Sequence, residues 1–239
     1  VGSEMCIRDS IIGVQANIWG EYIQTPEYFE YMAFPRLLAM SEVQWTQPEH
    51  KDFESFARRL DKEFERLDYC GVNACRNFYE VNQAGAWNKS QQTYEVTLNT
   101  FCPDADIYYA VNDSTVNTSS SLYETPIPLD EDATIYSAVY RSGKPLGKVT
   151  RKSFAVNKAT GCDYTCNPET GWEHLNKGFG LTDGRRGYAR DMRRWISFYQ
   201  DTVQIVVELK KPQKVKEVAF SSLWRPVNEI WPARAMSVS

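Results

Sequence analysis

Several residue patterns are missing or scarce in this chain, and each absence excludes a class of protein. Only two histidines occur, His50 and His174, and the six cysteines do not show the spacing of a zinc site. No stretch approaches the roughly 18 consecutive apolar residues that a membrane-spanning helix needs. The 27 Lys and Arg residues are outnumbered by 31 Asp and Glu, so the net charge is -4. The basic surface of a nucleic-acid-binding domain is therefore not expected.

Two pairs of cysteines lie close enough in the sequence to close small loops. They are Cys70 with Cys75 and Cys162 with Cys166. A disulfide also needs a defined separation and orientation of the two Cβ atoms, which a sequence does not report. Free thiols are the favoured interpretation, and either local bridge is the alternative.

The most informative stretch lies near the amino terminus. An apolar run over residues 11–18 ends in the sequence Trp-Gly-Glu-Tyr, and a helix start signal follows at residues 25–27. This order predicts a buried strand whose carboxyl end opens into a loop and then a helix. Ligands of such units bind at the carboxyl end of the strand. If the extended conformation continues, Trp19 and Glu21 share one side, which suits the apolar face and the hydroxyl groups of a sugar ring.

Three helical segments are predicted after this loop. Thr25 can cap the first, Pro26 is tolerated at its first position, and Pro35 separates it from a second segment over residues 36–45. A third helix is predicted over residues 52–68, with a stop at Gly71. Its apolar face comprises side chains spaced three or four residues apart: Phe53, Phe56, Leu60, Phe64 and Leu67.

Residues 13–22, the Pro-Arg-Leu of 35–37 and the Glu-Val-Gln-Trp of 42–45 closely resemble the end of the catalytic barrel of glycoside hydrolase family 20. Members of that family are β-N-acetylhexosaminidases. The resemblance implies that residues 11–81 carry the last strand and helices of a (β/α)₈ barrel. It also implies that Trp19 forms one wall of an aromatic pocket around a terminal N-acetylhexosamine, and that Glu21 accepts hydrogen bonds from the hydroxyls at carbons four and six. The alternatives are rim packing for Trp19 and a helix-start or loop carboxylate for Glu21.

The family resemblance also implies where the reaction chemistry lies. Most glycosidases use two carboxylates, but here the 2-acetamido oxygen of the substrate is the nucleophile. An adjacent Asp-Glu pair on an earlier strand orients the acetamido group and acts as general acid and base. That pair is expected upstream of this chain, which is therefore predicted to be inactive by itself. Residues 1–10 do not resemble the family and are predicted to be foreign or mis-joined sequence.

A small antiparallel β-sandwich is predicted over residues 82–157. Alternating runs at 94–98, 107–111 and 134–140 are separated by turn-forming residues. The pattern resembles the small β-sandwich domain that follows the catalytic domain in bacterial chitobiases. No convergent polar cluster stands out in it, so a structural role is expected.

Residues 158–239 resemble the front half of a discoidin-like, galactose-binding-like jelly roll. The resemblance is carried by Leu-Thr-Asp-Gly at 181–184, by Trp195, and by apolar runs at 203–209 and 212–218. Such modules often bind glycans and hold a structural calcium ion, so Asp183 is a candidate calcium ligand, with a turn residue as the alternative. The candidate sugar platforms are the tryptophans at 195, 224 and 231, with core packing as the alternative for each.

Together these observations predict a multidomain α+β fragment: the end of a (β/α)₈ barrel, an antiparallel β-sandwich and an incomplete β jelly roll. The expected function is that of the carboxyl-terminal part of an exo-β-N-acetylhexosaminidase that acts on glycans with a terminal N-acetylhexosamine. No cofactor is expected apart from the candidate calcium ion. The family is mostly secreted, so a periplasmic or extracellular location is expected. The alternatives are a non-catalytic carbohydrate-binding module and a set of structural accessory domains.

Overall fold

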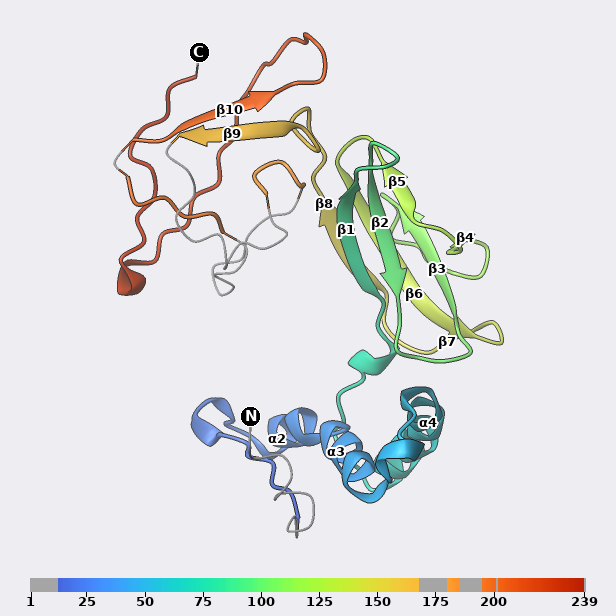
Figure 1. The fold of residues 1–239 in the computed structure, drawn as a ribbon. Coiled ribbons are helices and arrows are strands. Elements are labelled where there is room, and N and C mark those ends of the chain that lie inside the picture. The colour runs from blue at the N-terminus through green and yellow to red at the C-terminus, as the bar shows by residue number, and fades with distance from the viewer. Residues whose placement is uncertain (1–12, 168–179, 185–194, 201, 239) are drawn as a thin grey trace.

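The computed structural model describes residues 13–167, 180–184, 195–200 and 202–238. A helical part comes first, a two-sheet β part follows it, and a two-stranded sheet lies near the carboxyl end (Figure 1). The helices are α2 (Pro26–Ala33), α3 (Arg36–Trp45) and α4 (Phe53–Tyr69), with short 3₁₀ turns at Gly20–Tyr22, Pro48–His50, Asn77–Tyr79 and Pro226–Asn228. Among the described residues, no helix is both long enough and apolar enough to cross a membrane.

The strand predicted over residues 11–18 is not observed. Residues 13–18 form an irregular, exposed segment, and residues 11 and 12 lie outside the described part. A buried parallel strand needs a hydrogen-bonded neighbour on each edge, and no described strand pairs with this segment. The predicted strand is therefore wrong for residues 13–18, and no neighbouring strand for this segment is present among the described residues.

Helices α2 and α3 follow the predicted order. The Thr25 side-chain oxygen accepts a hydrogen bond from the Tyr28 backbone N–H at 3.2 Å, and Pro26 is the first helical residue. This cap satisfies one backbone donor that the first turn would otherwise leave free. Pro35 separates the two helices, because it has no N–H to continue the ladder of α2.

Helix α4 begins and ends as the sequence predicts. The Asp52 carboxylate accepts hydrogen bonds from the N–H groups of Glu54 and Ser55 at 2.9 and 3.4 Å. Gly71 takes the positive φ of 70° that lets the chain turn away from the helix end. Of the predicted apolar face, Leu60 and Phe64 are buried, whereas Phe53 in the first turn is 61% exposed.

The β-sandwich is formed by two antiparallel sheets. The strands are β1 (Asn82–Asn88), β2 (Thr93–Asn99), β3 (Asp106–Val111), β4 (Ser121–Leu122), β5 (Ile127–Leu129), β6 (Ala133–Arg141), β7 (Lys144–Pro145) and β8 (Thr150–Phe154). One sheet has the order β1-β2-β5; the other has the order β4-β3-β6-β7, with β8 also paired to β6. The side chains of Val96, Ile135 and Val139 are fully buried between the sheets. The predicted antiparallel β architecture is therefore confirmed for this part of the chain.

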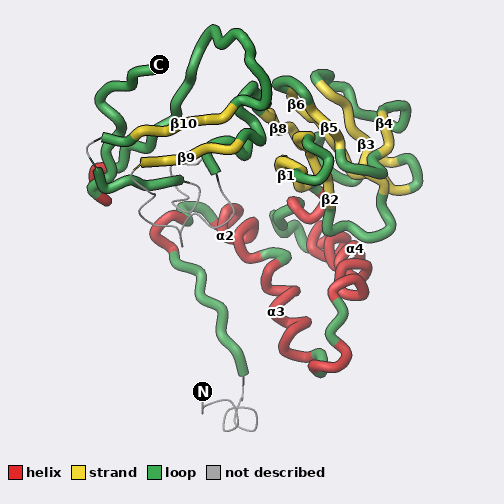
Figure 2. Tube along the Cα trace, turned by 45° about the horizontal axis from the view of Figure 1, so that its top comes forward, coloured by secondary structure: helices red, strands yellow, loops and turns green. Residues whose placement is uncertain are grey.

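Helix α4 shares its core with the sandwich. Leu60 and Phe64 belong to the same buried cluster as the sandwich residues Leu98, Ile107 and Val139. Figure 2 shows α4 next to one end of the two sheets. The apolar face of α4 is therefore buried in the core of the sandwich, although the sequence predicted that this helix belongs to the preceding domain.

The last part contains a two-stranded antiparallel sheet. Strand β9 (Asp163–Asn167) pairs with β10 (Gln204–Glu208), which lies within the predicted run at 203–209. The run at 212–218 is irregular instead of extended into a paired strand. Trp224 and Trp231 are each 69% exposed, so the core-packing alternative is wrong for both. The described residues of this part form one two-stranded sheet, which does not by itself identify a jelly roll.

Candidate functional site

The predicted sugar-binding loop lies immediately before α2. Trp19 is the last extended residue, with φ -82° and ψ 123°, and its side chain is 73% exposed. Glu21 is also exposed and lies inside the 3₁₀ turn Gly20–Tyr22, which is closed by a 3.0 Å hydrogen bond from the Ile23 N–H to the Gly20 carbonyl. The expectation that Trp19 and Glu21 share one side required an extended chain through Glu21. The turn replaces that conformation, so strand alternation does not bring the two side chains together.

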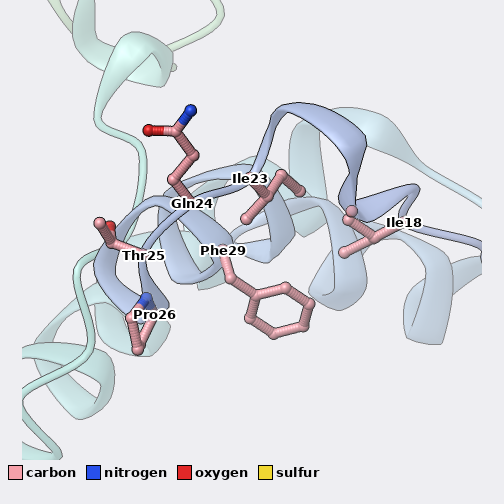
Figure 3. A pocket seen from close by; sticks show the side chains of 7 residues that line it. Ile18, Ile23, Gln24, Thr25, Pro26 and Phe29 are labelled. Atoms are coloured by element: carbon pink, nitrogen blue, oxygen red, sulfur yellow. The ribbon is translucent and has the colours of Figure 1, made fainter.

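An open hollow of 420 Å³ adjoins this loop (Figure 3). It is lined by Ile18, Gly20, Ile23, Gln24, Thr25, Pro26 and Phe29. Its side chains are mostly apolar, with the Phe29 ring beneath Ile23 and the Gln24 amide pointing away from the ring. Neither Trp19 nor Glu21 lines it, although Gly20 between them does. The hollow therefore offers an apolar surface beside the loop, and Ile18 and Gly20 are the residues through which the loop reaches it.

Asp183 lies in a turn of the third part of the chain. Its carboxylate oxygen Oδ2 accepts a hydrogen bond from the Gly180 N–H at 3.1 Å, and Gly184 follows with a φ of 74°. Among the described residues, no cluster of three or more His, Cys, Asp or Glu side chains could hold a metal ion. The geometry is that of a turn-stabilising Asp, and the calcium role stays a prediction. Of the candidate platforms, Trp195 is half-buried, unlike the two exposed tryptophans described above.

The described cysteines are all free thiols, as the sequence favoured. They are Cys70, Cys75, Cys102, Cys162 and Cys166. Cys6 lies outside the described residues. Burial raises the pKa of the Cys102 and Cys166 thiols, which keeps both in the neutral, less reactive form.

Sequence patterns did not reveal the polar cluster at the junction of α4 and the sandwich. Arg141 Nη1 on β6 donates to Asp61 Oδ2 on α4 at 2.6 Å, and the Tyr79 hydroxyl donates to Asp61 Oδ1 at 2.6 Å. Arg141 Nη2 also donates to the Pro103 carbonyl at 2.9 Å and lies 3.0 Å from Cys102 Sγ. Burial, followed by the hydrogen bond to Asp61, raises the pKa of Tyr79. Arg141 Nε is buried without a hydrogen-bond partner among the described residues, while both Nη atoms of Arg141 and both carboxylate oxygens of Asp61 are paired. The cluster has the chemistry of a structural junction.

Comparison with known proteins separates the chain into two matched regions. Residues 3–48 match the model of the glycosyl hydrolase family 20 catalytic domain, and residues 82–151 match that of the chitobiase/beta-hexosaminidase C-terminal domain. The first match begins inside residues 1–10, whose predicted foreign origin stays a prediction. Helix α4 lies between the two matched regions.

Two known proteins illustrate the similarity. The chain is 51% identical over 63 residues to a beta-hexosaminidase of Porphyromonas gingivalis (strain ATCC BAA-308 / W83), a stretch that is 26% of this chain and 8% of the relative. It is 38% identical over 52 residues to a beta-N-acetylhexosaminidase of Cellulomonas fimi, covering 22% of this chain and 10% of the relative. The aligned stretches thus span about a tenth or less of each relative's length. In their order along the chain, the two family matches show a piece of a glycosyl hydrolase family 20 catalytic domain followed by a chitobiase/beta-hexosaminidase C-terminal domain.

Proposed function

We propose that the protein containing this chain is an exo-acting β-N-acetylhexosaminidase that removes a terminal N-acetylhexosamine from glycans. The observation that carries this proposal is the catalytic-domain match over residues 3–48, which includes Trp19 and Glu21. The names of the two similar proteins, a beta-hexosaminidase and a beta-N-acetylhexosaminidase, support the same substrate class. By the same reasoning we propose a periplasmic or extracellular location.

The proposed mechanism retains the configuration at the anomeric carbon and is assisted by the substrate. The acetamido carbonyl oxygen attacks the anomeric carbon while a general acid protonates the departing glycosidic oxygen. Water then opens the resulting cyclic intermediate, and the same carboxylate accepts the proton. The Asp-Glu pair that orients the acetamido group and transfers these protons is proposed to lie upstream of residue 1.

In this mechanism Trp19 and Glu21 bind the sugar and take no part in proton transfer. The exposed Trp19 indole supplies a flat apolar face for the ring, and the exposed Glu21 carboxylate accepts hydrogen bonds from its distal hydroxyls. Both residues flank Gly20, which lines an apolar hollow. We propose that the remaining walls of the pocket come from the rest of the catalytic domain.

The test uses the natural full-length protein and a chromogenic N-acetyl-β-glucosaminide. Glu21→Gln removes the charge that accepts the sugar hydroxyls and should lower kcat/KM by about 10- to 100-fold, or roughly 1–3 kcal/mol. The matched control is Glu49→Gln, which changes an exposed glutamate in the turn Pro48–His50 and should leave kcat/KM within about twofold. A specificity constant that Glu21→Gln leaves unchanged would remove Glu21 from the site. Hydrolysis by residues 1–239 alone would show that the catalytic pair was misplaced.

A carbohydrate-binding role for the third part of the chain is the second candidate. It rests on the exposure of Trp224 and Trp231, because such indole faces suit stacking against sugar rings. Calorimetry of the full-length protein with galactose, N-acetylglucosamine and N-acetylgalactosamine tests it, using a Trp224→Ala, Trp231→Ala variant as control. If the variant releases the same heat as the wild-type protein, the third part does not bind these sugars through its tryptophans.

A further inference from the structure

A short segment after α4 is hydrogen-bonded to both ends of α2, and Asn73 makes the two bonds to its amino-terminal part. The side-chain amide of Asn73 donates from Nδ2 to the Glu27 carbonyl at 2.9 Å, and the Asn73 backbone N–H donates to Glu30 Oε2 at 2.8 Å. Glu27 belongs to the first turn of α2 and Glu30 to the next. These two hydrogen bonds, named the Asn73 clamp, hold the amino-terminal part of α2. The carboxyl-terminal part is held separately, by the Tyr31 hydroxyl donating to Asn77 Oδ1 at 3.3 Å and by the Cys75 N–H donating to the Phe34 carbonyl at 3.0 Å.

The chain between α4 and Asn73 is held in place by backbone hydrogen bonds, and α4 is packed against the sandwich. The chain leaving α4 is closed by hydrogen bonds from Gly71 N–H to the Asp68 carbonyl at 3.0 Å and from Val72 N–H to the Leu67 carbonyl at 2.9 Å. Helix α4 itself is held by its buried face and by the ion pair between Asp61 and Arg141 of the sandwich. Asn73 therefore follows directly on a helix whose buried face belongs to the sandwich core.

The α2 side of the clamp leads directly to the sugar-binding loop. Glu27 lies six positions after Glu21, and the intervening chain is turned by the Ile23 to Gly20 hydrogen bond and the Thr25 cap. Pro26 and Phe29 of α2 line the hollow that also contains Gly20. Any rotation of α2 therefore moves the loop and one wall of the hollow together.

We propose that Asn73 is a positioning residue for the Trp19 and Glu21 loop. This inference rests on the proposed sugar-binding function of that loop. Asn73 does not touch the sugar; it transmits the fixed orientation of α4 and the sandwich to the amino-terminal end of α2. Its loss leaves the binding groups intact but lets them sample orientations in which they do not converge on one sugar.

The main test is Asn73→Asp in the natural full-length protein. The substitution keeps the shape of the side chain, removes the donor to the Glu27 carbonyl, and places a negative charge beside the Glu30 carboxylate. We expect KM to rise about 3- to 10-fold with kcat changed less than about twofold, as for a lost hydrogen bond that aligns a binding group. Asn99→Asp is the matched control, because Asn99 is an exposed residue at the end of β2.

A double-mutant cycle distinguishes positioning from general destabilisation. If Asn73 acts through Glu21, Asn73→Asp should raise KM much less in a Glu21→Gln background than in the wild-type background. If the increase in KM is the same in both backgrounds, the effects are independent and the proposal is overturned. If Glu21→Gln has no effect on kcat/KM at all, the proposed function of the loop has failed.

A readout that does not depend on activity uses residues 1–239 labelled with 5-fluorotryptophan. The fluorine signal of Trp19, assigned by Trp19→Phe, should shift or broaden in Asn73→Asp, whereas the signal of Trp87 on β1 should stay in place. An unmoved Trp19 signal in a folded variant would overturn the inference. Should Asn73→Asp fail to fold, Glu30→Ala removes the other half of the clamp from the α2 side and serves as the second test. A displaced Trp19 signal together with an inert Glu21→Gln variant would leave the mechanical link standing and refute only the sugar-binding role.

Discussion

Replacing Phe64 with alanine tests the finding that α4 belongs to the sandwich core. The Phe64 side chain is 2% exposed, and its ring lies 5.3 Å from the Tyr79 ring and 6.2 Å from the Phe78 ring. The Arg76 guanidinium lies 4.2 Å from the centre of the same ring. The substitution removes this packing and leaves a cavity between the helix and the sheets.

The structure allows the magnitude to be bounded with a control on the same helix. Buried Phe→Ala substitutions cost about 3–5 kcal/mol of unfolding free energy. Phe53 has the same side chain but is 61% exposed, with ring contacts to Phe101 at 6.0 Å and to Phe56 at 6.4 Å, so Phe53→Ala should cost about 1 kcal/mol. The expected difference is at least about 2 kcal/mol.

The assay is urea unfolding of residues 1–239, followed by far-ultraviolet circular dichroism for the helices and by hydrogen exchange for α4 and β6. With a slope of about 1–3 kcal/mol per molar urea, Phe64→Ala should lower the midpoint by roughly 2 M. Exchange should accelerate in α4 and in β6 alike, because both elements share the cluster that contains Phe64. Equal midpoints for the two alanine variants, or faster exchange confined to α4, would refute the shared core.

Three further predictions concern single polar contacts. Asp61→Asn should lower the unfolding free energy by about 2 kcal/mol, because Arg141 would lose the charged partner of a partly buried ion pair, and urea midpoints measure the loss. Thr25→Ala should weaken the start of α2 by about 1 kcal/mol, seen as faster amide exchange in its first turn with α4 unchanged. The hydrogen bond from Arg58 holds the pKa of Asp104 below its ordinary value, so this pair stabilises the fold above about pH 4 and loses its effect as the pH falls through the lowered pKa. Asp104→Asn should therefore make the melting temperature fall less steeply below about pH 4. If the melting temperature of the variant falls with pH as steeply as that of the wild-type protein, the Arg58–Asp104 pair does not contribute to acid stability.

The sequence predicts the local elements well because their causes are local. Thr25 and Asp52 each satisfy a helix start with their own side-chain oxygen, and Gly71 ends α4 with a positive φ. The strands of the sandwich follow from alternation along β2, β3 and β6. None of these features needs knowledge of a distant residue.

The strand predicted over residues 11–18 is wrong because a strand depends on residues far away in the sequence. A strand is stabilised by hydrogen bonds to its neighbours, so its own apolar pattern is not sufficient. The arrangement of Trp19 and Glu21 failed with it, since their predicted alignment assumed that strand geometry continued through Glu21. The 3₁₀ turn Gly20–Tyr22 decides where their side chains point.

The sequence by itself determined the three helices with their starts and stops, the alternating strands of the sandwich, and which family the first and middle parts resemble. Tertiary structure alone decided that α4 packs into the sandwich, that Arg141 meets Asp61 from 80 residues away, and that Asn73 holds α2. The physical reason is the range of the interactions. A cap or a turn is settled within a few residues of chain, whereas a shared core or a clamp exists only once folding has brought separate segments into contact.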